Sequence, residues 1–137
     1  MNEKCNWPGK TNEPIKFYPI GIVVSQFDES SRWDQVKDKT SRIIIDQSLE
    51  PGLEGLRPGD QLSILFYFHQ IQDFILTQHP KGDMNRPKRG VFTICSPKRP
   101  NPIGLTVVEL VSMDKNVLEV RGLDAFDGTP VIDIKPV

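Results

Sequence analysis

Proline places the strongest constraint on this chain, in the segment Ser96-Pro97-Lys98-Arg99-Pro100-Asn101-Pro102. Each proline fixes its own φ and lacks a backbone donor, so the segment can be neither a helix nor a central strand. It is expected to be a stiff connector between two strands. Because a rigid loop holds polar side chains in place, Arg99 and Asn101 are candidate ligand contacts. A guanidinium and an amide suit a carboxylate, a phosphate or an adenine edge, and a purely structural turn is the alternative.

The other apolar residues fall in short runs rich in β-branched and aromatic side chains, separated by turn-forming residues. Strands are expected over Ile15 to Phe27, Arg42 to Asp46, Gln61 to Gln70, Asp73 to Thr77, Leu105 to Ser112, Val117 to Leu123 and Val131 to Ile134. The most hydrophobic run, Gln61 to Gln70, is expected to be a central strand covered on both faces. Seven or eight short strands without a long helix indicate an all-β fold, a closed or nearly closed β-barrel.

The charged segment Asp28 to Thr40 is expected to be a loop or a short helix. Trp33 and Val36 are three residues apart, which fits one or two helical turns, and Ser30 or Ser31 is the expected cap. We therefore expect a barrel whose connections contain short helical turns.

A length of 137 residues fits one domain that buries roughly 70% of its unfolded surface. Residues 1–14 are expected to be a flexible tail, and residues 15–137 the barrel domain. The two cysteines, Cys5 and Cys95, show no paired spacing, and His69 and His79 do not complete a zinc pattern, so no metal is expected. No apolar run approaches the roughly 18 residues of a membrane span, and a soluble, cytoplasmic protein is expected.

Positive charge is concentrated in one part of the chain. The total net charge is −1, yet six basic residues and one acidic residue lie between Lys81 and Arg99. Localised basic charge on an acidic protein favours a directed anionic partner such as a nucleotide or a folded RNA, and a solvated loop is the alternative. The candidate RNA contacts are Arg86, Lys88, Arg89 and Lys98.

Two further polar groups are candidates for a site. His69-Gln70 ends the buried strand, where a pocket at the strand mouth or a structural histidine would explain it. Asp124 and Asp127-Gly128-Thr129 place two carboxylates in a tight turn, suited to a ribose hydroxyl pair or an amine, unless they only cap the turn. A nucleophilic role for Cys95 would require a partner base, and none is evident. The motifs of Rossmann, P-loop, zincin and α/β-hydrolase proteins are absent from the sequence.

Three long motifs occur in one order along the chain: Phe68-His69-Gln70, the run from Gly90 to Thr106 (GVFTICSPKRPNPIGLT), and the run from Leu123 to Pro136 (LDAFDGTPVIDIKP). Together they closely resemble the TsaA-like, or TrmO-like, family. Pro19-Ile20-Gly21-Ile22-Val23 matches the opening strand of that family. The resemblance covers roughly residues 15 to 137.

The resemblance implies a single-sheeted β-barrel that binds S-adenosylmethionine, usually as a homodimer. In the best-understood branch the substrate is the threonylcarbamoyladenosine beside the tRNA anticodon. The cofactor contacts carried over from the family are His69, Gln70, Leu105, Ala125, Phe126, Asp127 and Gly128, with Arg99 and Asn101 on the loop that shapes the same pocket. Methyl transfer from a sulfonium needs alignment, dehydration and a base rather than a metal, and His69 and Asp127 are the catalytic candidates.

Three departures from the family pattern concern the same pocket. Cys95 stands where the family usually has an arginine, so one cofactor or phosphate contact is expected to be missing. The segment Asp28 to Thr40 lacks the Pro-Arg-Gln-Pro-like sequence that helps close over the cofactor. The chain stops at Val137 and is expected to lack the smaller C-terminal domain of some members. The alternatives to a methyltransferase are a non-catalytic barrel that binds a nucleotide-like ligand or RNA, and a thiol-dependent activity at Cys95.

Overall fold

The computed structural model describes residues 7, 13–28 and 30–137, so the flexible tail expected over residues 1–14 lies almost wholly outside the described residues. Six strands form a closed antiparallel barrel in the order β1-β2-β7-β6-β3-β8. Their bounds are Gly21–Val24 (β1), Thr40–Ile45 (β2), Gln61–Tyr67 (β3), Ile103–Asp114 (β6), Val117–Arg121 (β7) and Pro130–Pro136 (β8). The predicted all-β, single-sheeted barrel is confirmed. No helix in the described ranges is long and apolar enough to cross a membrane.

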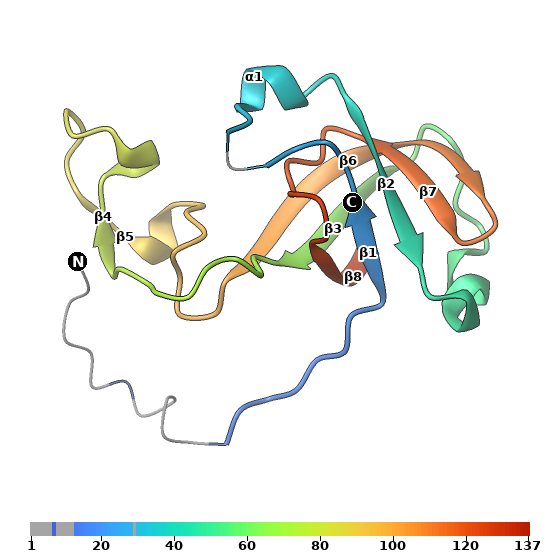
Figure 1. Cartoon of the computed structure of the whole chain (residues 1–137), viewed down its shortest axis with the longest axis horizontal. Coiled ribbons are helices and arrows are strands. Elements are labelled where there is room, and N and C mark those ends of the chain that lie inside the picture. The colour runs from blue at the N-terminus through green and yellow to red at the C-terminus, as the bar shows by residue number, and fades with distance from the viewer. Residues whose placement is uncertain (1–6, 8–12, 29) are drawn as a thin grey trace.

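A smaller unit interrupts the barrel between β3 and β6, and we call residues 71–102 the wing. It contains β4 (Thr77–Gln78) and β5 (Arg89–Gly90), which pair antiparallel, and two 3₁₀ turns, η3 (Pro80–Gly82) and η4 (Val91–Thr93). Figure 1 shows the wing to one side of the barrel, joined to it by two segments that leave β3 and return into β6. The basic and proline-rich part of the sequence therefore lies beside the barrel rather than in its wall.

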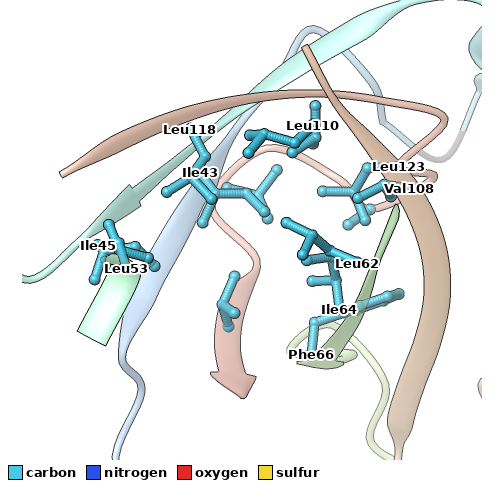
Figure 2. Close-up of a cluster of buried hydrophobic side chains, with 14 residues drawn as sticks. Ile43, Ile45, Leu53, Leu62, Ile64, Phe66, Val108, Leu110, Leu118 and Leu123 are labelled. Atoms are coloured by element: carbon cyan, nitrogen blue, oxygen red, sulfur yellow. The ribbon is translucent and has the colours of Figure 1, made fainter. Parts of the chain in front are cut away.

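Aliphatic side chains from alternate strand positions fill the barrel, and Figure 2 shows them pointing toward one another. On β3, Leu62, Ile64 and Phe66 are at most 2% exposed, whereas Tyr67 is 39% exposed. The prediction that this strand is covered on both faces is wrong, because a barrel strand buries only alternate side chains. Each large buried side chain contributes roughly 1.5–3 kcal/mol, so this interior supports the end of β3 firmly.

The strands predicted over Ile15 to Phe27 and Asp73 to Thr77 are much shorter in the structure. The first was expected from Ile15, but β1 begins at Gly21, because Pro19 has no N–H to donate and the residues before it are exposed. Gly21 allows close approach to β2, since a Cβ there would lie 2.6 Å from the carbonyl oxygen of Ile44. The strand expected over Asp73 to Thr77 is reduced to β4, which begins only at its last residue.

The proline-rich loop was expected between two strands, and this prediction holds on one side only. The loop leads into β6, but the apolar run before it forms the 3₁₀ turn η4 instead of a strand. Thr93 Oγ1 donates to the carbonyl of Gly90 at 2.7 Å, and the N–H of Ile94 donates to the carbonyl of Val91 at 3.4 Å. These local bonds compete with sheet pairing and close the turn.

The predicted short helix is present as α1 (Trp33–Val36), with only its last residue buried. Its cap is not a serine as expected. The N-cap is Arg32, whose backbone N–H donates to Gln35 Oε1 at 3.1 Å, while Ser30 and Ser31 hydrogen-bond within the preceding loop. The side chain of Gln35 therefore satisfies the backbone N–H of the N-cap residue itself.

The strands predicted over Leu105 to Ser112 and Val117 to Leu123 correspond to β6 and β7, which form a hairpin with a tight turn at Lys115 and Asn116. Lys115 has a φ of 56°, and the side-chain amide of Asn116 donates to the carbonyl of Ile45 at 2.7 Å. A further 3₁₀ segment, η2 (Gln47–Leu53), follows β2 and buries Leu53 against the core. These elements close the end of the barrel away from the wing.

Candidate functional site

A pocket of about 420 Å³ opens where β3 ends, and we call it the mouth pocket. It lies within the size range of small-molecule sites. Its lining residues come from β3, from the segment that follows it, from the wing loop and from the turn before β8: Phe66, Phe68, His69, Gln70, Ile71, Pro97, Asp124, Ala125, Phe126 and Thr129. The structure thus brings His69 and Gln70 together with Ala125 and Phe126, four residues that the sequence singled out from two distant segments.

A tight turn after β3 directs His69 and Gln70 to the mouth pocket. The N–H of Phe68 donates to the carbonyl of Pro102 at 2.8 Å, and the N–H of Ile71 donates back to the carbonyl of Phe68 at 3.1 Å. The strand therefore stops at Tyr67. His69 is half-buried and Gln70 is exposed, so both polar ends remain accessible at the rim.

The turn before β8 forms the opposite wall. Gly128 has a φ of 83°, which a residue with a side chain rarely adopts, and its N–H donates to the carbonyl of Val23 at 2.8 Å. Thr129 closes the turn by donating its N–H and its hydroxyl to the carbonyl of Phe126, at 3.1 and 2.6 Å. A Cβ on Gly128 would lie 4.0 Å from His69 Nε2, so the two predicted site segments meet here.

The two carboxylates of this turn have structural partners and remain exposed. Asp127 Oδ1 accepts from the backbone N–H of Ser25 at 3.0 Å, which ties the turn to the segment that follows β1. Asp124 Oδ1 accepts from the hydroxyl of Thr106 at 2.8 Å. A carboxylate has about four acceptor positions, so each retains capacity for a ligand. Asp124 lines the mouth pocket and Asp127 lies beside it in the same turn.

Arg99 and Asn101 do not line the mouth pocket. Arg99 Nη1 donates to the carbonyls of Ile94 and Ser96, at 2.7 and 3.1 Å, and so fixes the loop that carries Pro97 into that pocket. Both polar residues instead line a separate pocket of about 450 Å³ on the wing. Leu105 lies outside the mouth pocket too, on the outer face of β6, where it is 64% exposed.

A cleft of about 990 Å³ lies on the wing, and we call it the basic cleft. Its cationic lining residues are Lys81, Arg86, Lys88, Arg89 and Lys98, and none of the described residues that line it is acidic. The structure therefore groups all four predicted RNA contacts in one concavity. A concavity lined by several exposed cations attracts anions.

His79 and Cys95 also line the basic cleft, besides the predicted RNA contacts. His79 Nδ1 lies 2.7 Å from the carbonyl of Arg86 and must donate to it, which leaves Nε2 for another partner. No sequence pattern indicated this role for His79, since its partner is seven residues away across a turn. Cys95 also lines the cleft and is exposed with a free thiol, so it stands among the cations rather than beside His69.

A family model described as the tRNA-methyltransferase O N-terminal domain matches residues 22–137. The chain belongs to this family. An S-adenosyl-L-methionine-binding protein of Archaeoglobus fulgidus is 41% identical over 120 residues, covering 85% of each chain. A probable S-adenosyl-L-methionine-binding protein of Methanothermobacter thermautotrophicus is 38% identical over 125 residues, covering 89% of each chain.

Solved structures of the tRNA-methyltransferase O family have the same fold. A crystal structure of TrmO is 30% identical with a TM-score of 0.72, and that of TrmO from Pseudomonas aeruginosa is 29% identical with a TM-score of 0.70. Each match covers 91% of this chain but only 58% and 56% of the solved chains. The chain therefore spans a little more than half the length of these relatives.

Proposed function

We propose that the chain binds S-adenosylmethionine in the mouth pocket and transfers its methyl group to a tRNA nucleoside, the threonylcarbamoyladenosine beside the anticodon. The observation that carries this proposal is the convergence of His69-Gln70 and the Asp124 to Thr129 turn on one pocket. Family membership and the names of the curated relatives support the choice of cofactor. The nucleoside is inferred from the family resemblance, and the location in the cytoplasm from the absence of a long apolar run in the sequence.

The residues of the mouth pocket fit this cofactor. Phe66, Phe68 and Phe126 provide aromatic walls for the adenine, because flat rings stack on aromatic faces. His69 and Gln70 offer a ring nitrogen and an amide at the rim. The exposed carboxylates of the turn suit the cationic sulfonium and amine groups, since unlike charges attract across a partly desolvated pocket.

When bound, S-adenosylmethionine supplies an electrophilic methyl group on a sulfonium centre. The chain has to orient the acceptor, exclude water and receive the proton that the accepting nitrogen loses. His69 and Asp127 remain the candidates for that proton, because a half-buried imidazole and an exposed carboxylate lie on facing walls of the site. Arg99 acts indirectly, by fixing the loop that carries Pro97.

The basic cleft is proposed to hold the tRNA backbone through Arg86, Lys88, Arg89 and Lys98. Cations that neutralise phosphates release counterions, which makes the affinity depend strongly on salt. The cleft and the mouth pocket share Pro97, which lines both. A backbone held in the cleft would therefore bring an adjacent nucleoside toward the mouth pocket.

A second copy of the chain is proposed to cover an apolar stripe on the outer face of the barrel. Tyr67, Ile103, Leu105 and Val107 are 39–64% exposed, and the last three occupy alternate positions of β6. Such a stripe is typical of an interface between subunits. The predicted contact of Leu105 with the cofactor then requires the dimer, because Leu105 does not line the mouth pocket of its own chain.

Calorimetry with S-adenosylmethionine tests the cofactor site. Saturable binding is expected, weakened about fivefold by His69→Ala, since one hydrogen bond is worth roughly 1 kcal/mol. Arg57→Ala, at the far end of the barrel, is the control. Methyl incorporation into tRNA that lacks the native modification then tests catalysis. Absence of binding heat at high ligand refutes the proposal, whereas binding without transfer favours a non-catalytic barrel.

A further inference from the structure

The pocket of about 450 Å³ on the wing differs in composition from the two concavities used above, and we call it the aromatic pocket. Its lining residues are three aromatic rings, one aliphatic side chain and the proline-rich loop: Trp7, Phe74, Phe92, Leu76, Arg99, Pro100 and Asn101. It contains one cation, and none of the described residues that line it is acidic. This combination favours a flat, weakly charged group over a bare phosphate.

The aromatic pocket and the basic cleft use neighbouring residues of the same segments. Phe74 and Leu76 line the aromatic pocket, whereas Ile75 and Thr77 line the cleft. The same division occurs in the proline-rich loop, where Lys98 lines the cleft and the next residue, Arg99, lines the aromatic pocket. The two sites are therefore adjacent, on either side of the same two segments of the wing.

The rings of the aromatic pocket are arranged to accept another ring. Trp7 and Phe74 meet edge to face, with centroids 6.3 Å apart and an interplanar angle of 85°. Such a pair leaves ring faces available, because only one face is covered by an edge. Phe92 is 78% exposed and Trp7 36% exposed. A nucleobase can stack on such a ring whatever its identity, because every base has a flat π-face.

Polar groups at the same pocket can contact the edge of a base. The side-chain amide of Asn101 makes no hydrogen bond within the described ranges, so both its donor and its acceptor are open. Arg99 also lines the pocket, and its Nη1 is held by two backbone carbonyls. Amides and guanidinium groups are the side chains that pair with base edges in unpaired RNA.

We propose that the aromatic pocket binds one unpaired nucleobase of the RNA whose phosphates lie in the basic cleft. Trp7 and Phe92 supply the stacking faces, Phe74 supports the ring of Trp7, and Asn101 and Arg99 contact the edge of the base. The pocket thereby selects single-stranded RNA next to the nucleoside that is methylated. The identity of that RNA as tRNA rests on the proposed function, whereas the binding of a base does not.

Tryptophan fluorescence provides the test, because the chain has only two tryptophans. In a Trp33→Phe background, Trp7 alone reports. Titration with adenosine 5′-monophosphate and with a ten-nucleotide single-stranded RNA, without cofactor, is expected to quench this fluorescence saturably. Phe92→Ala and Asn101→Ala are each expected to weaken RNA binding about tenfold. Phe17→Ala, which removes another exposed phenyl ring, is the matched control.

Anisotropy of labelled RNA is measured on the same samples. Unchanged Trp7 fluorescence with saturating, bound RNA overturns the proposal. So does a fluorescence change that follows protein concentration rather than RNA, which would mean that a second copy covers the pocket. A protein that methylates no tRNA but still shows RNA-dependent quenching refutes the proposed function alone, so the two failures are distinguishable.

Discussion

Gly104 of β6 lies directly against the ring of Phe66, its partner across the β3–β6 ladder. A Cβ on Gly104 would lie 2.5 Å from two ring carbons of Phe66 and 2.9 Å from a ring carbon of Phe68. These two rings pack edge to face with centroids 5.1 Å apart, and both line the mouth pocket. The missing side chain at position 104 therefore fixes the aromatic wall of the proposed cofactor site.

Gly104→Ala is expected to destabilise the chain by roughly 1–3 kcal/mol, because the new methyl overpacks a closed interior. Cofactor affinity is expected to fall as well, since the displaced rings wall the pocket. Chemical denaturation and calorimetry measure the two effects. Gly52→Ala is the control, because a Cβ at Gly52 meets nothing within 4 Å. Equal stability of the two variants would show that the rings move aside freely.

Asp127 is expected to contribute to both structure and binding. Asp127→Ala removes the acceptor of the Ser25 N–H and is expected to cost roughly 1 kcal/mol of stability. Asp127→Asn keeps an acceptor oxygen and is expected to restore most of that stability but not the affinity for a cationic cofactor. Thermal unfolding and calorimetry on the pair separate the two roles. Full affinity in Asp127→Asn would exclude an electrostatic role for the carboxylate.

Arg99 is expected to act on the mouth pocket through its loop. Arg99→Ala leaves the carbonyls of Ile94 and Ser96 without their donor, which is expected to cost roughly 1–2 kcal/mol and to weaken cofactor binding. Arg99→Lys keeps the charge but lacks the planar fork, so only partial rescue is expected. Proteolysis rates of the wing report loop order directly. An intact loop with reduced affinity would indicate direct contact with the cofactor.

Salt dependence tests the basic cleft. The double variant Lys88→Ala/Arg89→Ala is expected to reduce the slope of log affinity against log salt by about 0.7–0.9 for each phosphate that is no longer neutralised. The measurement is RNA binding by anisotropy between low and moderate salt. Arg57→Ala removes an exposed cation outside the cleft and should leave the slope unchanged. An unchanged slope in the double variant would place the RNA elsewhere.

The pKa of Asp46 is lowered because its carboxylate accepts hydrogen bonds from the hydroxyl and the backbone N–H of Ser48. A carboxyl group whose pKa is lower in the folded than in the unfolded state stabilises the fold at pH values above its unfolded pKa. This stabilisation is lost as the pH falls through the folded pKa. Asp46→Asn does not titrate. The stability difference between the wild type and this variant should therefore shrink as pH falls below about 4. Denaturation at several pH values measures it, and a constant difference would contradict the assignment.

Local signals in the sequence predicted most of the barrel. The hairpin between β6 and β7 follows from apolar and polar side chains that alternate on either side of a turn. The 3₁₀ segment η2 lies at the start of the turn-rich segment after β2. The incorrect predictions concern features that depend on other residues of the chain. Whether β3 is covered on one face or both depends on closure of the sheet, and the helix cap at Arg32 depends on the glutamine three residues later.

The sequence by itself determined the chemistry that is available: His69-Gln70, the two carboxylates of the turn before β8, and a stiff loop with Arg99 and Asn101. Only the tertiary structure decided which of these groups lie at the same pocket. Barrel closure sets His69 against Gly128, although the two are far apart in the sequence, because β3 and β8 pair. The wing carries Arg99 and Asn101 to a different pocket, because the chain leaves the barrel between β3 and β6 and local sequence cannot encode that separation.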